Sequence, residues 1–404
     1  MDSLTLRVSA LALIAVAATA PSFAAQPLTA CPGGKDLVLT NGKILTVDAT
    51  DRTVSTVRIR GQRFLTVGEP VDAKTPCVRI VDLGGRTVVP GLIDNHTHFV
   101  RTAQAPGPFI AGLESADSIR SLQQALAEAA RRAEPGEWVA AIGGFTPIQF
   151  VEKRMPTREE LTTAVPDHPV YLQVGYSTRG LVNDDGRRVL ASAGITTSEA
   201  GDVATDGKGL THVIRSATEA RMKRRFPDYM NYAVSLGLTT VVDHACCDWL
   251  GAHLTDEDRP NLKIAEQFWR AGRIPLRLRI QYDHRDTRDQ KDIHSATARM
   301  ANATQGLGDD HYKAVRFGEQ VLKAGATDDE IYEVFLHLAQ GGWALSQHTI
   351  KHEETEKYLR IMERVAAVAP VKDLRWTLEH VFEITSDQVE RLKKIGVGVR
   401  VQDH

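Results

Sequence analysis

The sequence predicts an α/β protein whose main body is a (β/α)₈ TIM-type barrel, preceded by a small β-sandwich module. From residue 236 onward, strand-like apolar runs alternate with helical stretches, which is typical of a parallel barrel. Before residue 88 the chain contains short strand-like runs separated by glycine turns. A mixed segment over residues 99–235 follows the first barrel strand and predicts an α/β insertion.

Residues 1–24 have the pattern of a secretory signal peptide. An apolar run over residues 8–18 follows Arg7, and small residues precede a cleavage point near Ala24. The run is too short to span a bilayer comfortably, which disfavours a membrane anchor. A lipoprotein box ending at Cys31 is an alternative, although prolines separate it from the apolar run. We therefore expect a periplasmic or secreted protein without membrane contact after cleavage.

The charge balance indicates which partners to expect. Lys and Arg number 49 and Asp and Glu 51, for a net charge of -2. This balance provides no electrostatic reason to bind nucleic acid or an anionic membrane. The expected partner is a small-molecule substrate, and no pattern indicates an oligomeric state.

Residues 31–88 predict an antiparallel β-sandwich module. The apolar run Asp36–Thr40 is followed by Asn41 and Gly42, a hairpin pattern, and further strand-like runs extend to Asp82. Cys31 and Cys77 flank strands of this module, and export permits a disulfide between them.

The other two cysteines, Cys246 and Cys247, are neighbours in the sequence. No CxxC pair exists, so a cysteine zinc site is not expected. We expect Cys246 and Cys247 to pack as small buried hydrophobic side chains.

The incomplete barrel is expected over residues 89–404, with seven strands. They are predicted at residues 88–98, 238–244, 276–282, 313–319, 343–348, 375–380 and 397–401. Helical patterns lie between them, for example over residues 328–340 and 353–368. A closed barrel of this type has eight strands. The sequence reaches Asp403 and His404 just after the seventh strand, so we expect these 404 residues to stop before the eighth strand.

Histidines end several of these strands. His96 and His98 are two residues apart, so in a strand both imidazoles project from the same face and can hold one metal ion. His348 and His380 end two later strands. Because parallel barrels place their active sites at the carboxyl ends of the strands, the four imidazoles are expected to converge at one mouth. Such convergence predicts a metal site, with zinc the expected ion.

The segment around the first histidine pair, VPGLIDNHTH at Val89–His98, resembles the signature of the amidohydrolase superfamily. Asp36–Thr46 resembles that superfamily's N-terminal β-module, and the insertion resembles the branch typified by N-substituted formamide deformylase. The resemblance implies one or two divalent metals held by the histidines of strands one, five and six and by a carboxylate on strand four. The implied histidines are His96, His98, His348 and His380.

The fourth-strand ligand has two candidates, Lys313 and Glu319, because family members use either a carboxylated lysine or a glutamate. Both share the parity that faces inward. Glu319 is favoured because it lies at the carboxyl end of the strand, level with the histidines. His244 and His404 also end strands and are secondary candidates. The family's general base is an aspartate ending the eighth strand, so no catalytic residue is assigned, and Asp403 comes too early to be that residue.

These features predict a metal-dependent hydrolase of amide or formamide carbon–nitrogen bonds other than peptide bonds. A metal-activated water would attack the carbonyl carbon. One alternative is a catalytically inactive exported protein that keeps metal or ligand binding; another is a lactone or ester hydrolase on the same scaffold. Without an eighth strand, the 404-residue chain is expected to be poorly soluble and inactive on amides.

Overall fold

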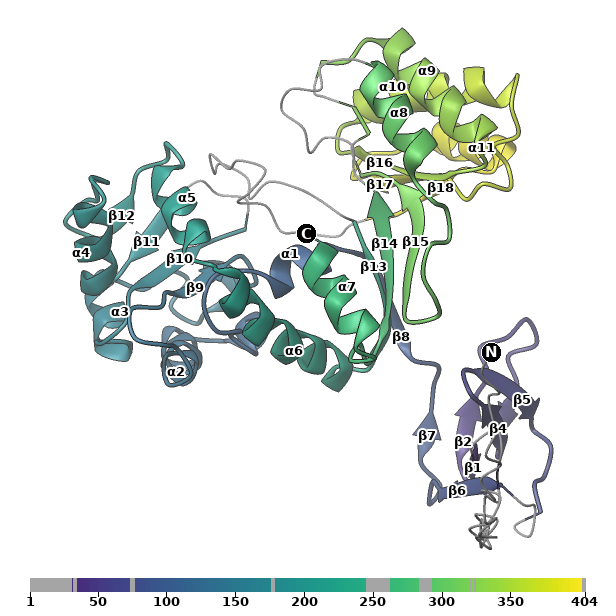
Figure 1. The fold of residues 1–404 in the computed structure, drawn as a ribbon, viewed down its shortest axis with the longest axis horizontal. Coiled ribbons are helices and arrows are strands. Elements are labelled where there is room, and N and C mark those ends of the chain that lie inside the picture. Colours follow the sequence, from purple (N-terminus) through teal and green to yellow (C-terminus); the bar gives the residue numbers. More distant parts are fainter. Residues whose placement is uncertain are drawn as a thin grey trace, which may run out of the picture. The chain divides into compact units, whose positions relative to one another are not determined.

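The structure is a computed structural model that describes residues 31, 35–72, 77–175, 179–244, 262–282, 293–319, 321–322 and 325–401 (Figure 1). The chain divides into two compact units, Met1–Pro90 and Gly91–His404. The expected signal peptide, the Cys246 and Cys247 pair, Asp403 and His404 lie outside the described residues. No described helix is long and apolar enough to cross a membrane.

Two small sheets form the first unit, in the orders β5-β4-β1-β6 and β3-β2-β7. Their strands are β1 Asp36–Thr40, β2 Lys43–Leu45, β3 Thr53–Val54, β4 Val57–Arg60, β5 Arg63–Val67, β6 Val78–Asp82 and β7 Thr87–Val88. β1 pairs antiparallel with β4 but parallel with β6, and β2 pairs parallel with β7. The prediction of a purely antiparallel module was therefore wrong. The chain between β1 and β6 is long enough to return in the same direction, which parallel pairing requires.

The hairpin predicted at Asn41 and Gly42 was also wrong. Both edges of β1 are occupied, one by β4 and the other by β6, so β2 cannot pair with it. Asn41 adopts a positive φ of 55° and its side-chain amide donates to the Asp82 carboxylate at 2.7 Å. The turn therefore passes the chain into the second sheet.

The disulfide predicted between Cys31 and Cys77 is confirmed, with the two Cα atoms 5.3 Å apart. This separation lies within the range that a disulfide requires. The bond joins the start of the described chain to the residue before β6.

Replacing both cysteines (Cys31→Ser with Cys77→Ser) is expected to destabilise the first unit by roughly 2–4 kcal/mol, because the open chain gains conformational entropy when it unfolds. Hydrogen exchange of the β1 to β6 amides, followed by mass spectrometry, measures the local opening free energy. The amides of the second unit serve as the internal reference and should not change. Equal protection of β1 to β6 in both proteins would contradict the prediction.

A seven-stranded sheet of order β18-β17-β16-β15-β14-β13-β8 forms the centre of the second unit. Its strands are β8 Leu92–Thr97, β13 Leu238–Asp243, β14 Arg277–Tyr282, β15 Tyr312–Phe317, β16 Ala344–Thr349, β17 Thr377–His380 and β18 Gly398–Val399. Every neighbouring pair is parallel, and Figure 1 shows β13, β14 and β15 side by side. The predicted fold class is confirmed: the strands form a curled parallel sheet of the barrel type.

Helices alternate with these strands. They are α6 Glu219–Ser235, α7 Leu262–Arg270, α8 Ile293–Asn302, α9 Asp328–Gln340, α10 His352–Ala366 and α11 Ser386–Ile395. Capping boxes at Thr327 and Thr385 satisfy the first N–H groups of α9 and α11. The apolar faces cover the sheet; for example, Phe335 of α9 and Trp376 beside β17 lie in one buried cluster. The helices therefore hold the strand ends at which the candidate site residues lie.

The insertion contains a sheet of order β12-β11-β10-β9. Its elements are α1 Phe99–Ala103, η1 Leu113–Ser115, α2 Ile119–Ala130, β9 Val139–Ile142, η2 Pro147–Gln149, α3 Arg158–Ala164, β10 Val170–Gln173, β11 Gly180–Val182, α4 Asp184–Ser192, β12 Asp202–Val203 and α5 Lys208–Arg215. We expected the insertion to reach residue 235, but Phe226 and Met230 of α6 share a core with Val241 of β13. The barrel therefore resumes at α6, because its apolar face covers β13.

Candidate metal centre

The site residues predicted from the sequence come from four different strands. His96 lies in β8 and His98 directly follows it, Glu319 lies two residues after β15, and His348 and His380 belong to β16 and β17. Their positions match the carboxyl ends of neighbouring parallel strands, which meet at one edge of the sheet. The structure brings all five side chains together, with each histidine within ion-pairing distance of Glu319.

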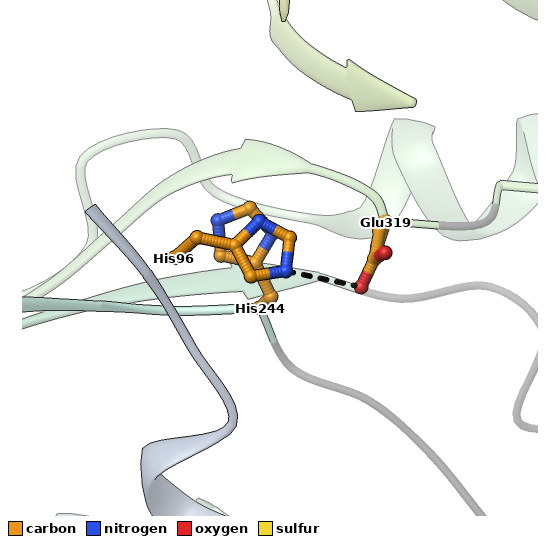
Figure 2. A group of neighbouring side chains, drawn as sticks. All are labelled: His96, His244 and Glu319. Atoms are coloured by element: carbon orange, nitrogen blue, oxygen red, sulfur yellow. Dashed lines mark ion pairs between the residues drawn. The ribbon is translucent and has the colours of Figure 1, made fainter. Parts of the chain in front are cut away.

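Glu319 lies at the centre of the group, and its two oxygens face different histidines. Oε1 lies 2.6 Å from Nε2 of His380 and 3.8 Å from Nε2 of His348. Oε2 lies 3.8 Å from Nε2 of both His96 and His98. Figure 2 shows the Glu319 carboxylate opposite the His96 ring. One carboxylate thus separates two pairs of imidazoles, each pair facing one oxygen.

The alternative fourth-strand ligand, Lys313, does not join this group. In the described part of the chain no hydrogen bond or ion pair links Lys313 to any of the four histidines. A register shift in β15 between its pairings with Ile280 and Gln281 lies between Lys313 and Glu319. The side-chain parity counted from the sequence therefore does not carry through from Lys313 to Glu319.

The environment keeps the group in the protonation states that metal ligands need. Burial opposes ionisation of Glu319, but the hydrogen bond from His380 and the neighbouring imidazoles outweigh it and lower the pKa of Glu319 to about 2. Burial, with the nearby Arg101 guanidinium, lowers the pKa of His98 to about 3. An ionised carboxylate and a neutral imidazole can both donate lone pairs to a cation.

Unsatisfied nitrogen atoms provide a test of whether these residues fit a metal ion. Within the described residues, Nε2 of His96, which faces Glu319, is buried without a hydrogen-bond partner; Nδ1 of His98 also has none, although the nitrogen of that ring that faces Glu319 is Nε2. Such orphaned atoms are costly in a folded protein unless another group completes them. Glu319 with His348 and His380, and Glu319 with His96 and His244, form two groups whose donor atoms lie within 4.8 Å of one another. The nitrogen and oxygen donors therefore fit a divalent metal such as zinc.

His244, the secondary candidate at the end of β13, lies against the site. Its ring stacks on His96 with centroids 3.7 Å apart, as Figure 2 shows. Nε2 lies 3.1 Å from the Asn95 carbonyl and 2.9 Å from Nη1 of Arg400. Burial lowers the pKa of His244 well below its usual value. A neutral Nε2 either donates to the carbonyl or accepts from Arg400, so the two contacts select alternative tautomers.

One residue of the site, Glu379, was missed by the sequence reasoning. Glu379 is fully buried and its Oε2 lies 2.8 Å from Nδ1 of His96. Its Oε1 accepts from Arg400 Nη1 at 2.9 Å and from the Thr377 hydroxyl at 2.5 Å. The contact between Oε2 of Glu379 and Nδ1 of His96 places the imidazole proton on Nδ1, which leaves Nε2 facing Glu319.

Backbone geometry explains why Glu379 was missed. Neighbouring residues of a regular strand point to opposite faces, so Glu379 and His380 were not expected at one site. His380 adopts a positive φ of 68°, which breaks this alternation. The position of Glu379 next to His380 was the available sequence clue, but the backbone conformation at His380 could not be predicted from the sequence.

Asp243 precedes His244 and supports the same edge of the sheet. Its carboxylate accepts from the backbone N–H of Val100 at 2.9 Å, at the start of α1. Burial raises the pKa of Asp243 to about 7. The contact ties the end of β13 to the turn that carries His98.

Comparison with known proteins shows the family to which the sequence is similar. A family model described as "Amidohydrolase family" matches residues 79–404. N-substituted formamide deformylase of Arthrobacter pascens is 28% identical over 231 residues, which cover 52% of this chain and 42% of that protein. Protein LONG AFTER FAR-RED 3 of Arabidopsis thaliana is 25% identical over 226 residues, or 52% of this chain and 38% of that protein. The chain thus spans less than half the length of these curated relatives.

The fold comparison agrees with the observed topology. An uncharacterized metal-dependent hydrolase from Pyrococcus furiosus superposes with a TM-score of 0.57 at 16% identity, covering 91% of this chain and 76% of that one. This likeness concerns the fold, and the family model covers most of the sequence, including every residue of the candidate site. The chain therefore belongs to the amidohydrolase family.

Proposed function

We propose that this protein is a metal-dependent hydrolase of carbon–nitrogen bonds other than peptide bonds, with an amide or formamide as substrate. One observation carries the proposal: Glu319 presents each carboxylate oxygen to a different pair of histidines. A carboxylate in this position can bridge two cations, with His96 and His98 on one side and His348 and His380 on the other. Zinc is the proposed ion because the donor set is nitrogen and carboxylate oxygen.

A bound divalent metal would polarise the substrate carbonyl and acidify a water molecule. The residues of the chain prepare this chemistry. Glu319 stays ionised because its histidine contacts outweigh the burial that raises its pKa, and the imidazoles of His98 and His244 stay neutral because burial lowers their pKa values. Glu379 holds the proton of His96 on Nδ1, so that the Nε2 lone pair points into the site.

The similarity to N-substituted formamide deformylase supports a formamide or a related amide as the substrate class. The disulfide between Cys31 and Cys77 supports export to an oxidising compartment, as the N-terminal pattern predicts. The same scaffold and metal set would also serve lactone or ester hydrolysis, so the substrate class needs a direct test.

The test combines metal analysis with a substrate panel. The purified chain is loaded with zinc, its metal content is measured by plasma mass spectrometry, and turnover is assayed on an N-substituted formamide, an N-acylated amine, a lactone and a carboxylic ester. We expect bound zinc, and any turnover to fall on the carbon–nitrogen substrates rather than on the lactone or the ester. Turnover of the lactone or ester alone would overturn the proposed substrate class, and a chain that binds no metal would overturn the proposal as a whole.

A further inference from the structure

A cavity of about 500 Å³ lies in the second unit, formed by residues other than the candidate metal ligands. Its wall includes residues of α1, α6 and the loops that follow β9 and β10. β9 and β10 are parallel neighbours. Crevices at the carboxyl ends of parallel strands are common ligand sites, and this volume lies in the usual range for a small molecule.

The cavity contains a buried cation, Arg225 of α6, whose side chain is 7% exposed. Its Nε donates to the Thr102 carbonyl at 3.2 Å and its Nη1 to the Gly107 carbonyl at 3.1 Å. The guanidinium also lies 5.4 Å from the centroid of the Phe109 ring. These contacts hold the group in place but provide no negative charge.

Within the described ranges, no carboxylate lies close enough to Arg225 to form an ion pair. The acidic groups in its surroundings are bound elsewhere: Glu137 lies 2.6 Å from Arg224, and Asp228 lies 3.6 Å from Arg132. A buried charge without a counter-ion is unfavourable. An anion that entered the cavity would remove this cost.

Two further charged side chains lie on the wall. They are Arg101 and Glu114, and the Glu114 carboxylate accepts a hydrogen bond from the Tyr232 hydroxyl. Gln173 also lines the cavity, and its Oε1 is already occupied by the Tyr171 hydroxyl at 2.8 Å. The polar group of the Gln173 side chain that this bond leaves over is the amide NH₂, which can donate hydrogen bonds to an anion.

The rest of the wall is apolar or bare backbone. Phe109 packs against Tyr229 and Tyr232 with ring centroids 5.2 and 5.1 Å apart. Gly143 and Gly144, just after β9, adopt φ values of 81° and 82°, which residues with side chains rarely adopt. At these two positions the wall therefore consists of backbone alone.

From this lining we infer that the cavity binds a small organic monoanion, a carboxylate with an aromatic or branched apolar body. The carboxylate would pair with the Arg225 guanidinium, and the apolar body would lie against Phe109, Tyr229 and Tyr232. The inference does not rest on the proposed hydrolysis, because none of these residues is a candidate metal ligand.

Phenylacetate and its neutral isostere phenylacetamide test the inference by calorimetric titration of the zinc-loaded chain. Phenylacetate should bind at least about tenfold more tightly, because only its carboxylate brings a negative charge to the guanidinium and can accept two parallel hydrogen bonds from it. Arg225→Met should remove this preference while phenylacetamide binds as before. Arg224→Met is the matched control, since Arg224 is the neighbouring residue on α6 and pairs with Glu134 and Glu137 outside the cavity.

Several results would overturn the inference. Equal binding of phenylacetate and phenylacetamide by the unmodified chain is one, and this measurement needs no variant to fold. An equal loss of phenylacetate binding in the Arg224 and Arg225 variants is another. Unchanged phenylacetate binding in Arg225→Met would place the ligand elsewhere, for example on the metal.

Arg225→Lys keeps the positive charge but loses the two parallel N–H donors of the guanidinium, so this variant should retain a reduced preference for phenylacetate.

Discussion

Glu319→Gln is expected to lower the zinc content of the purified chain from about two equivalents to below about one, and with it any metal-dependent hydrolysis by a factor of about a thousand. The amide has nearly the same shape but carries no negative charge and has one oxygen in place of two. It therefore cannot present an anionic oxygen to both histidine pairs, as Glu319 does. Plasma mass spectrometry after dialysis measures the zinc content directly.

Glu390→Gln is the matched control, because Glu390 is an exposed glutamate on α11 whose one ion pair among the described residues is with Lys393 at 3.7 Å. That variant should keep the full zinc content. If Glu319→Gln also retained two equivalents of zinc, the bridging role of Glu319 would be wrong, and the histidines alone would hold the metal.

Glu379→Gln is expected to weaken zinc binding by roughly 10- to 100-fold without removing any direct ligand. The carboxylate holds the Nδ1 proton of His96 and is itself held by Arg400 and Thr377. An amide can accept the same proton, but it lacks the charge that makes the opposite nitrogen a better donor. Competition with a chromophoric zinc chelator measures the dissociation constant.

The melting temperature of the metal-free protein separates this role from simple packing. A positioning role predicts weaker zinc binding with a similar metal-free melting temperature for Glu379→Gln and unmodified protein. Glu379→Asp, which keeps the charge on a shorter side chain, should recover part of the affinity. Unchanged affinity in Glu379→Gln would show that the hydrogen bond to His96 does not tune the site.

The sequence by itself determined the local and periodic features of this protein. Strand–helix alternation after residue 236 predicted the parallel sheet, because buried parallel strands and amphipathic helices have distinct apolar patterns. The strand-end positions of His96, His98, His348 and His380 predicted their convergence, because parallel strands bring their carboxyl ends to one edge. Two cysteines flanking one small module likewise predicted the disulfide that the structure contains.

Only the tertiary structure decided the features that depend on contacts between distant residues. The pattern at Asn41 and Gly42 predicted a hairpin, but β4 and β6 occupy both edges of β1. Local turn preference cannot account for strands that arrive from later in the chain.

The same limit applies to the site and the cavity. Glu379 reaches His96 from β17, where its register partner is His348, and the positive φ of His380 breaks the strand alternation for the imidazole that follows. Arg225 is one arginine of an arginine-rich helix in the sequence, and its burial away from every described carboxylate follows from the packing of α6 against α1 and the loop after it. Residue type and spacing predict which groups can do chemistry, whereas three-dimensional packing decides which charges are paired and which remain available to a ligand.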